Sequence, residues 1–329
     1  MKGELRIFAP EATRIFGEEV AGALRRGLDP LEERDFEDGE HKIRPLCTVR
    51  GTEAVVIQSL HGGPEESPND KLCRMLFLIG ALRTSGAARV TAVVPYLAYA
   101  RKDRQTKARD PLTLAYVARL IEAAGAERVL TMEVHDLAAL QNAFRVETAA
   151  LDTRALFLGR AAEIAGEGPV AVASPDPGGV KRAQLFREAL EARLGRPVGF
   201  ALMEKRRSRG EVTGTLFAGA VEGARVLVVD DLISSGGTMV RAARACLEAG
   251  AAEVHALAAH GLFTGDAADK LADPALARVI VSDTVPPFRL AHVDLSDRLE
   301  VIPAAPLFAE AIRRLHAGGS VSELIGIDI

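Results

Sequence analysis

The sequence predicts an α/β protein of two similar domains, each a mostly parallel sheet flanked by helices. One phrase occurs three times: a helical stretch ends in Gly-Ala, and a β-branched run follows (residues 85–90, 124–129 and 249–254). Such a glycine ends a helix in the left-handed conformation, and repeated helix-to-strand units indicate a parallel sheet covered on both faces. The length of 329 residues favours two domains.

Short apolar runs bounded by turn residues predict strands at residues 54–58, 90–95, 129–134, 170–174, 225–229 and 279–282. Amphipathic stretches predict helices at residues 11–26, 70–85, 113–124, 178–194, 238–249 and 307–323. We place the domain boundary near Ala150, which gives an N-terminal domain of residues 1–150 and a C-terminal domain of residues 151–306. The C-terminal helix, residues 307–329, is a candidate to pack on the N-terminal domain.

The composition excludes several classes of protein. The net charge is −4, so there is no basic excess of the kind that binds nucleic acid or anionic membranes. No apolar run approaches the roughly 20 residues that span a bilayer, and charged residues interrupt the N-terminus where a signal peptide would be apolar. Cys47, Cys73 and Cys246 are scattered without a CxxC pair, which favours a reducing cytoplasm over disulfides or a zinc site.

The most informative segment follows the predicted strand that ends at Val229. Gly236 and Gly237 allow the backbone to approach a ligand closely, and the next helix supplies free N–H groups for a phosphate. Two carboxylates accept hydrogen bonds from the cis 2- and 3-hydroxyls of ribose. We therefore expect a ribose 5-phosphate site formed by Asp230, Asp231, Ser234, Ser235, Gly236, Gly237 and Thr238. The competing interpretation is a plain helix cap beside two solvated acids.

Residues 228–238 resemble the phosphoribosyl-diphosphate-binding motif of the type I phosphoribosyltransferase fold. Phosphoribosyltransferases share this motif with ribose-phosphate diphosphokinases. Further segments resemble the diphosphokinases in the same order along the chain, namely residues 36–40, 95–104, 129–135, 174–179, 205–207 and the tail at 309–322. The resemblance implies transfer of the diphosphoryl group of ATP to the 1-hydroxyl of ribose 5-phosphate, with AMP as the other product and Mg²⁺ bridging the phosphates.

The resemblance assigns catalysis to Lys205 and Arg207, in a basic loop that closes over the phosphates and excludes water. The two alternate with Arg206, so in an extended segment they face the same side. A solvated basic loop is the alternative. The resemblance makes His135 and Asp176 metal-site residues, with His135 acting through water. The alternatives are a structural histidine and an acid that caps a helix.

The ATP site is assigned by the same resemblance to Phe36, Asp38, Glu40, Arg101, Lys102 and Arg109. Phe36, Asp38 and Glu40 alternate along a short segment, which offers an aromatic face for adenine and two acceptors for its amino group. A polar turn after a buried Phe is the alternative. In the family this segment completes the ATP site of a neighbouring subunit, so a homo-oligomer is expected. Tyr96 and Tyr99 are expected to pack.

The chain departs from the common family pattern at Lys102, Asp136, Ser234 and Ser235. Lys102 stands where Gln is usual, so nucleotide preference is open, and regulation by ADP or phosphate does not carry over. Three other functions stay open. They are a non-catalytic regulatory relative, a purine or pyrimidine phosphoribosyltransferase, and a diphosphokinase acting on another pentose phosphate or donor.

Overall fold

The computed structural model describes residues 3–208, 211–291, 295 and 297–325, and the side chains of residues 204–208 and 211–216 lie outside this description. The chain divides into two units. Unit 1 comprises Met1–Asp152 together with Ala304–Ile329, and unit 2 comprises Thr153–Pro303. The division follows Asp152, beside the expected boundary near Ala150.

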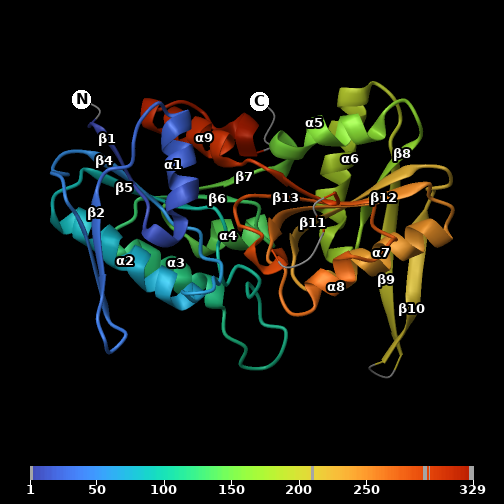
Figure 1. Ribbon diagram of the computed structural model, residues 1–329, viewed down its shortest axis with the longest axis horizontal. Coiled ribbons are helices and arrows are strands. Elements are labelled where there is room, and N and C mark those ends of the chain that lie inside the picture. Colours follow the sequence, from blue (N-terminus) through green and yellow to red (C-terminus); the bar gives the residue numbers. More distant parts are fainter. Residues whose placement is uncertain (1–2, 209–210, 292–294, 296, 326–329) are drawn as a thin grey trace. The chain divides into compact units, whose positions relative to one another are not determined.

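Unit 1 contains a parallel sheet with the strand order β1-β4-β5-β6-β7. Its strands are β1 (Leu5–Phe8), β4 (Glu53–Ile57), β5 (Arg89–Val94), β6 (Arg128–Met132) and β7 (Glu147–Leu151). Figure 1 shows α2 (Pro68–Thr84), α3 (Thr113–Ala124) and α4 (Leu137–Ala143) on one face, and α1 (Arg14–Ala23) and α9 (Ala305–Ala317) on the other. Both faces are therefore covered, as a parallel sheet requires.

Unit 2 contains a sheet with the strand order β10-β9-β8-β11-β12-β13-β14, in which the β9–β10 pair is antiparallel and the other pairs are parallel. The strands are β8 (Val170–Ser174), β9 (Gly199–Ser208), β10 (Glu211–Gly219), β11 (Arg225–Ile233), β12 (Glu253–Gly261), β13 (Arg278–Ser282) and β14 (Leu299–Ile302). Its helices are α5 (Thr153–Ala165), α6 (Val180–Leu194), α7 (Gly237–Glu248) and α8 (Ala267–Leu271).

Strand β11 lies between β8 and β12 and is buried on both faces. Val226 and Val228 belong to the apolar cluster that includes α7, whereas Leu227 and Val229 belong to the cluster that includes α5 and α6. Alternate residues of one strand thus pack into two separate cores, because successive side chains point to opposite faces of the sheet. This explains why the strand reads as an unbroken apolar run.

The repeated Gly-Ala phrase has the predicted conformation. Gly86, Gly125 and Gly250 have φ of 89°, 112° and 90°, each between a helix and a strand. Several predicted boundaries are wrong, and the first helix, expected to reach residue 26, ends at Ala23. Strand β11 continues to Ile233 because it stays paired with β12, β6 ends at Met132 rather than Val134, and the C-terminal helix ends at Ala317 because Gly318 turns left-handed.

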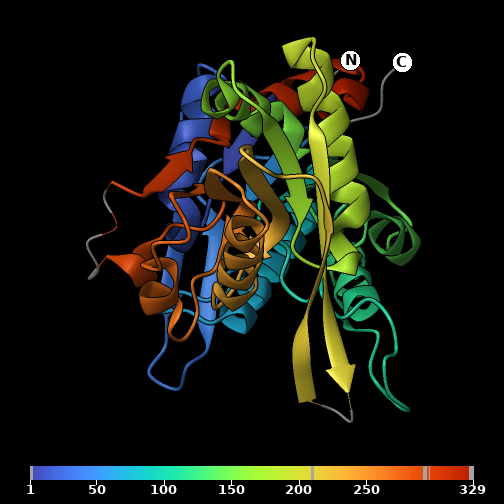
Figure 2. The ribbon, with the colours of Figure 1, turned by 90° about the vertical axis from the view of Figure 1, so that its right-hand side faces the viewer.

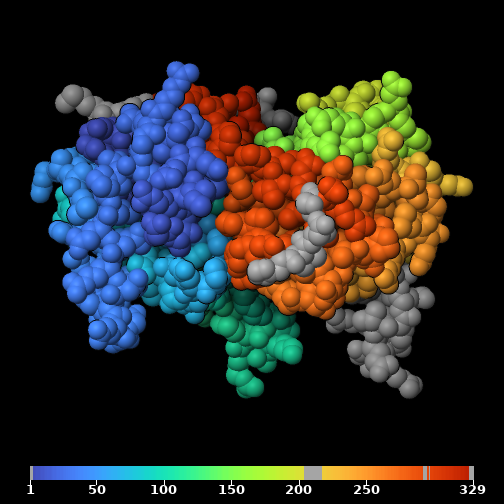
Figure 3. Space-filling model, viewed as in Figure 1, coloured from blue at the N-terminus to red at the C-terminus, as the bar shows by residue number. Residues whose placement is uncertain are grey.

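Two antiparallel hairpins were not predicted from the sequence. The first joins β2 (Leu31–Asp35) to β3 (His41–Pro45) in unit 1, and the second joins β9 to β10 in unit 2. The first hairpin and the chain at residues 101–112 both project from the body of unit 1 (Figures 1 and 3). Figure 2 shows the second hairpin extending beyond the rest of its sheet. Both hairpins carry residues that the sequence assigns to the site.

The C-terminal helix α9 returns to unit 1 and packs on α1. The rings of Phe16 and Phe308 meet edge to face at 5.6 Å between centroids. His316, in the last turn of α9, lies 2.8 Å from the carboxylate of Glu53, which also binds Arg128 at 3.3 Å. Glu53 is buried, so the guanidinium of Arg128 and the contact with His316 compensate its desolvation.

No helix among the described residues is long and apolar enough to cross a membrane.

His255 on β12 is buried, and neither ring nitrogen has a hydrogen-bond partner within the described structure. Burial lowers the pKa of His255 below its ordinary value of 6.5, although nearby Glu253 opposes the shift. The unfolded chain therefore binds more protons than the folded one when the pH falls below about 6.5. Acidification through this range should destabilise unit 2.

We expect the thermal midpoint of the wild-type protein to fall between pH 7.5 and pH 5.5 more steeply than that of His255→Leu, which has no proton to take up. The single-proton limit of this extra slope is about 1.4 kcal/mol per pH unit. Scanning calorimetry of both proteins across the range measures the difference. Parallel curves for the two proteins would rule out His255 as the source.

Candidate active site

The segment between β11 and α7 forms a tight glycine turn. Gly236 has φ of 75°, and a Cβ there would lie 3.0 Å from Cδ2 of Leu271 on α8. Helix α7 then begins at Gly237 and leaves its first N–H groups at the turn. A turn that needs glycine for both conformation and space, followed by a free helix N-terminus, suits an anionic phosphate group.

Asp230 and Asp231 lie within β11 rather than after it, which corrects the sequence-based boundary. Adjacent strand residues point to opposite faces of the sheet. Each of these two carboxylates nevertheless accepts a hydrogen bond from the backbone N–H of the next residue: Oδ1 of Asp230 from Asp231 (2.9 Å), and Oδ1 of Asp231 from Leu232 (3.0 Å). Burial is the main cause that raises the pKa of Asp230 well above its usual range, and the neighbouring charge of Asp231 adds to the rise. Arg182 opposes it.

The hydroxyl groups of the turn also have local partners. Oγ of Ser234 lies 2.8 Å from Oγ1 of Thr264, in the segment after β12. Oγ1 of Thr238 accepts a hydrogen bond from Arg241 at 3.2 Å, one turn further along α7. Ser235 is half-buried. The sequence did not single out Thr264 or Arg241, because neither belongs to the 230–238 motif, although Arg241 follows Thr238 at helical spacing.

Asp176 follows β8 and caps the short helix Pro177–Gly179. Its Oδ1 accepts hydrogen bonds from the N–H groups of Gly178 (2.9 Å) and Gly179 (3.2 Å). The capping alternative weighed from the sequence is therefore realised. A carboxylate has two oxygens, so one cap does not use up its capacity to bind a metal or a hydroxyl.

Residues 205 and 207 lie on strand β9, and not on a loop as expected. The backbone pairs Lys205 with Thr215 and Arg207 with Val212 of β10. Antiparallel pairing explains the change, since residues 201–208 of β9 form a ladder with β10. The side chains of Lys205 and Arg207 lie outside the described residues, so their assignment stays a prediction.

His135 lies in unit 1 between β6 and α4, three residues after the strand ends at Met132. It is exposed within the described structure. The next residue, Asp136, caps α4 by accepting a hydrogen bond from Ala139 N–H at 2.9 Å. A family-atypical residue thus has a structural explanation, because Asp is a favoured N-cap.

Phe36, Asp38 and Glu40 form the turn of the β2–β3 hairpin, which corrects the expected alternating segment. Phe36 N–H donates to the carbonyl of Glu40 (2.8 Å), and Glu40 N–H donates to Asp38 (3.1 Å). Phe36 is 40% exposed, and the Arg34 guanidinium carbon lies 5.1 Å from the centroid of its ring. The aromatic ring and both acids are therefore presented at an exposed tip.

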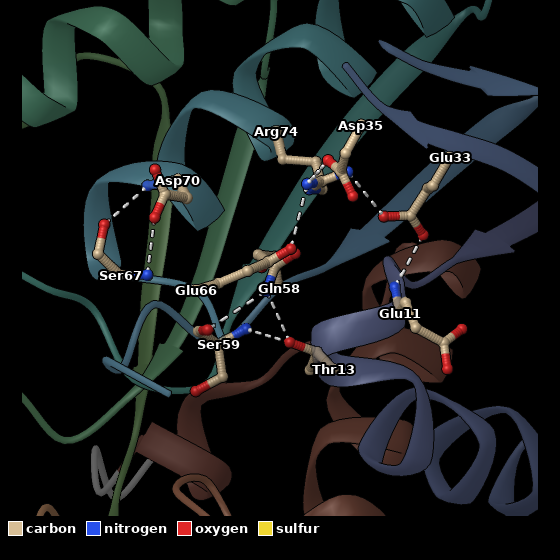
Figure 4. A network of polar contacts seen from close by, with 10 residues as sticks. All are labelled: Glu11, Thr13, Glu33, Asp35, Gln58, Ser59, Glu66, Ser67, Asp70 and Arg74. Atoms are coloured by element: carbon tan, nitrogen blue, oxygen red, sulfur yellow. Dashed lines mark hydrogen bonds and ion pairs between the residues drawn. The ribbon is translucent and has the colours of Figure 1, made fainter. Parts of the chain in front are cut away.

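One buried arginine anchors this hairpin to α2 (Figure 4). The guanidinium of Arg74 binds Asp35 at 2.6 Å, Glu66 at 3.2 Å and Glu33 at 3.4 Å, and its side chain is 6% exposed. Burial alone would lower the pKa of Arg74, but the bond to Asp35 and the surrounding acids outweigh it and raise that pKa. Asp35 directly precedes Phe36, so the anchor lies one residue from the tip.

Residues 101–112 form a loop arranged around Asp110. This carboxylate binds Lys102 Nζ at 2.5 Å and accepts hydrogen bonds from the N–H groups of Thr106 (3.1 Å) and Lys107 (2.9 Å). The hydrogen bond from Lys102 is the largest cause that holds the pKa of Asp110 well below its usual range. Arg101 and Arg109 are exposed on the same loop. Tyr96 and Tyr99 pack against the core of unit 1, as expected.

The candidate residues divide between the two units. Unit 1 carries His135 and the six residues assigned to ATP, whereas unit 2 carries Asp176, the strand with Lys205 and Arg207, and the ribose-phosphate turn. Within the described part of the chain, no group of three or more His, Cys, Asp and Glu side chains forms a metal cage.

A parallel sheet with an acid pair and a glycine turn at one strand end is typical of an α/β protein that binds a phosphorylated ligand at the carboxyl edge of its sheet. The chain matches a family model for the N-terminal domain of ribose phosphate pyrophosphokinase over residues 5–125, and one for the phosphoribosyl synthetase-associated domain over residues 202–326. Together these two matches cover most of the chain.

Curated relatives are similar over nearly their full length. The ribose-phosphate pyrophosphokinase of Caldanaerobacter subterraneus subsp. tengcongensis is 39% identical over 321 residues, 97% of each chain. That of Hyphomonas neptunium is 36% identical over 97% of this chain and 99% of its own. The crystal structure of phosphoribosylpyrophosphate synthetase from Mycobacterium smegmatis has 32% identity and a TM-score of 0.84, covering 96% of this chain and 100% of that one. The chain belongs to the ribose-phosphate pyrophosphokinase (diphosphokinase) family.

Arg74→Met should loosen the β2–β3 hairpin, because three carboxylates would lose their shared cation and repel one another. We expect amide hydrogen exchange in residues 31–45 to speed up by about tenfold or more. Mass spectrometry of the exchanged protein measures this. Arg44→Met is the matched control, since Arg44 pairs with Glu32 on the same hairpin with a side chain that is 57% exposed. Equal protection in the two variants would contradict the anchor.

Proposed function

We propose that this chain transfers the diphosphoryl group of ATP to the 1-hydroxyl of ribose 5-phosphate, giving 5-phosphoribosyl 1-diphosphate and AMP. The observation that carries the proposal is the Asp230–Asp231 pair beside the Gly236 turn, in a chain that belongs to the family. The reaction supplies activated ribose for nucleotide biosynthesis. Neither a phosphoribosyltransferase nor a non-catalytic relative accounts as well for full-length similarity to named pyrophosphokinases.

In the proposed site, Asp230 and Asp231 accept hydrogen bonds from the 2- and 3-hydroxyls of the sugar. Ser234, Ser235, Thr238 and the N–H groups of Gly236 and Gly237 hold the 5-phosphate at the start of α7, where the helix dipole favours an anion. The 1-hydroxyl is then left free for attack on the donor. This arrangement makes the sugar phosphate an acceptor.

Lys205 and Arg207 are the proposed catalytic pair. They lie two residues apart on β9, and cations there would neutralise charge that develops on the transferred group and on the departing AMP. A hairpin that approaches the substrates would also keep water from the donor.

For ATP we propose Arg101, Lys102 and Arg109 from one subunit, with Phe36, Asp38 and Glu40 from a neighbouring subunit of a homo-oligomer. The tip of the β2–β3 hairpin supports this division, since its ring and two acids are exposed within their own subunit. Lys102 is bound to Asp110, so its contact with a phosphate requires sharing or exchanging that partner.

Mg²⁺ is the proposed cofactor, and the donor set is compatible with it. Mg²⁺ prefers oxygen ligands, keeps several waters and often takes only one or two protein carboxylates together with substrate phosphates. Asp176 supplies such a carboxylate, and His135 would act through a metal-bound water. When bound, the ion neutralises and orients the phosphate chain. We further propose a cytoplasmic location and no nucleic-acid or membrane partner.

The central test is to incubate the protein with ATP, Mg²⁺ and ribose 5-phosphate and to quantify AMP and phosphoribosyl diphosphate. We expect both products, and a loss of about 100-fold or more in kcat for Lys205→Ala and for Arg207→Ala, because each removes a cation from the transition state. Arg206→Ala, which removes the intervening cation, should retain most activity. Absence of either product in the wild-type protein would refute the proposal.

The shared ATP site predicts that activity depends on oligomerisation. Light scattering coupled to the same assay at decreasing protein concentration should show activity falling as subunits separate. Phe36→Ala should raise the KM for ATP and leave that for ribose 5-phosphate nearly unchanged. A fully active monomer would contradict the shared site.

A further inference from the structure

Arg182 lies beside the acid pair of the ribose-phosphate site but outside the 230–238 motif. It occupies the first turn of α6, three residues after Gly179. Its Nη1 atom lies 3.3 Å from Oδ1 of Asp230, and its Nη2 atom lies 4.0 Å from Oδ2 of Asp231. One guanidinium therefore faces both carboxylates proposed to bind the sugar.

The three side chains form a largely enclosed cluster. Their exposed fractions are 15% for Arg182, 18% for Asp230 and 8% for Asp231. A cation at this distance offsets the mutual repulsion of two adjacent carboxylates, and the low exposure limits screening by solvent. Arg182 opposes the rise in the pKa of Asp230 that burial and Asp231 cause, so its removal would favour proton uptake by the pair, and a protonated acid is a poorer acceptor for a hydroxyl.

The turn before α6 leaves room for this contact. A Cβ added to Gly179 would lie 2.9 Å from Oγ of Ser174, 3.6 Å from Nη1 of Arg182 and 4.0 Å from Oδ1 of Asp230. The Asp176 cap fixes the backbone of the same turn through Gly178 and Gly179. The strand end of β8 thereby directs α6, and with it Arg182, toward the strand end of β11.

We propose that Arg182 is a positioning residue that holds Asp230 and Asp231 as paired acceptors for the sugar diol, and that it thereby sets the preference for ribose 5-phosphate over 2-deoxyribose 5-phosphate. This rests on the proposed function of the acid pair as the diol-binding group. Arg182 itself needs no contact with the substrate. Its effect reaches the sugar through the two carboxylates, so it should alter sugar recognition much more than ATP recognition.

The test compares wild type, Arg182→Gln and Arg182→Lys with both sugar phosphates. For Arg182→Gln we expect kcat/KM with ribose 5-phosphate to fall by about tenfold or more, mainly through KM, while the KM for ATP changes less than about twofold. The ratio of kcat/KM between ribose 5-phosphate and 2-deoxyribose 5-phosphate should shrink. Arg182→Lys keeps the charge and should recover part of both losses.

Arg193→Gln is the matched control, since it removes an exposed cation from the same helix. It should match wild type in every parameter. Equal losses on both sugars, or an equal rise in the KM for ATP, would assign Arg182 a purely structural role and overturn the proposal. Unchanged kinetics in Arg182→Gln would overturn it as well.

Calorimetric titration with each sugar phosphate in the absence of ATP separates this inference from the proposed function. A wild-type protein that fails to form phosphoribosyl diphosphate refutes the catalytic proposal. The inference about Arg182 is judged instead by binding: it requires that wild type bind ribose 5-phosphate more tightly than the deoxy sugar, and that Arg182→Gln lose this difference. Thermal midpoints of all variants confirm that folded proteins are compared, and Arg182→Lys serves if the Gln variant does not fold.

Discussion

The parallel pairing of β11 with β8 on one side and β12 on the other is the constraint on which the ribose-phosphate site depends. Parallel neighbours end at the same edge of a sheet, so the segments after these three strands converge there. Asp176 follows β8, the acid pair lies near the end of β11, and Thr264 follows β12. The polar groups meet at this edge because the apolar residues between them fill two cores.

Much of the two sheets was predictable because several of their strands, such as β4 and β8, are buried on both faces, and because the glycine turns left a clear signal. Helix α3 and strand β8 have the predicted bounds. A predicted strand end was wrong where backbone pairing continued beyond the apolar run. Asp230 and Asp231 interrupt the hydrophobic run of β11, yet the strand stays paired with β12 as far as Ile233. The β2–β3 hairpin was not predicted for a related reason. Its strands are largely charged, and they gain stability from Arg74 on α2, which lies far away in the sequence.

The candidate residues were found through the motif and the resemblance, whereas their local roles required the structure. Asp136 and Asp176 are helix caps, which only the positions of the following N–H groups reveal. Arg182 was missed because it contacts Asp230, which lies far from it in the sequence. Asp110 was missed because it contacts Lys102 only in the folded loop. Sequence spacing reports neighbours along one element, but side chains that meet across elements leave no such pattern.

The return of α9 to unit 1 makes that unit discontinuous along the chain, with unit 2 inserted between its two parts. During synthesis, residues 5–151 can form their sheet, but the face of α1 that receives Phe308 stays uncovered until residues 305–317 have left the ribosome. Unit 2, which is contiguous, carries no such delay. Unit 2 can therefore complete its fold before unit 1, although translation of unit 1 begins first, because unit 1 needs the last helix, α9.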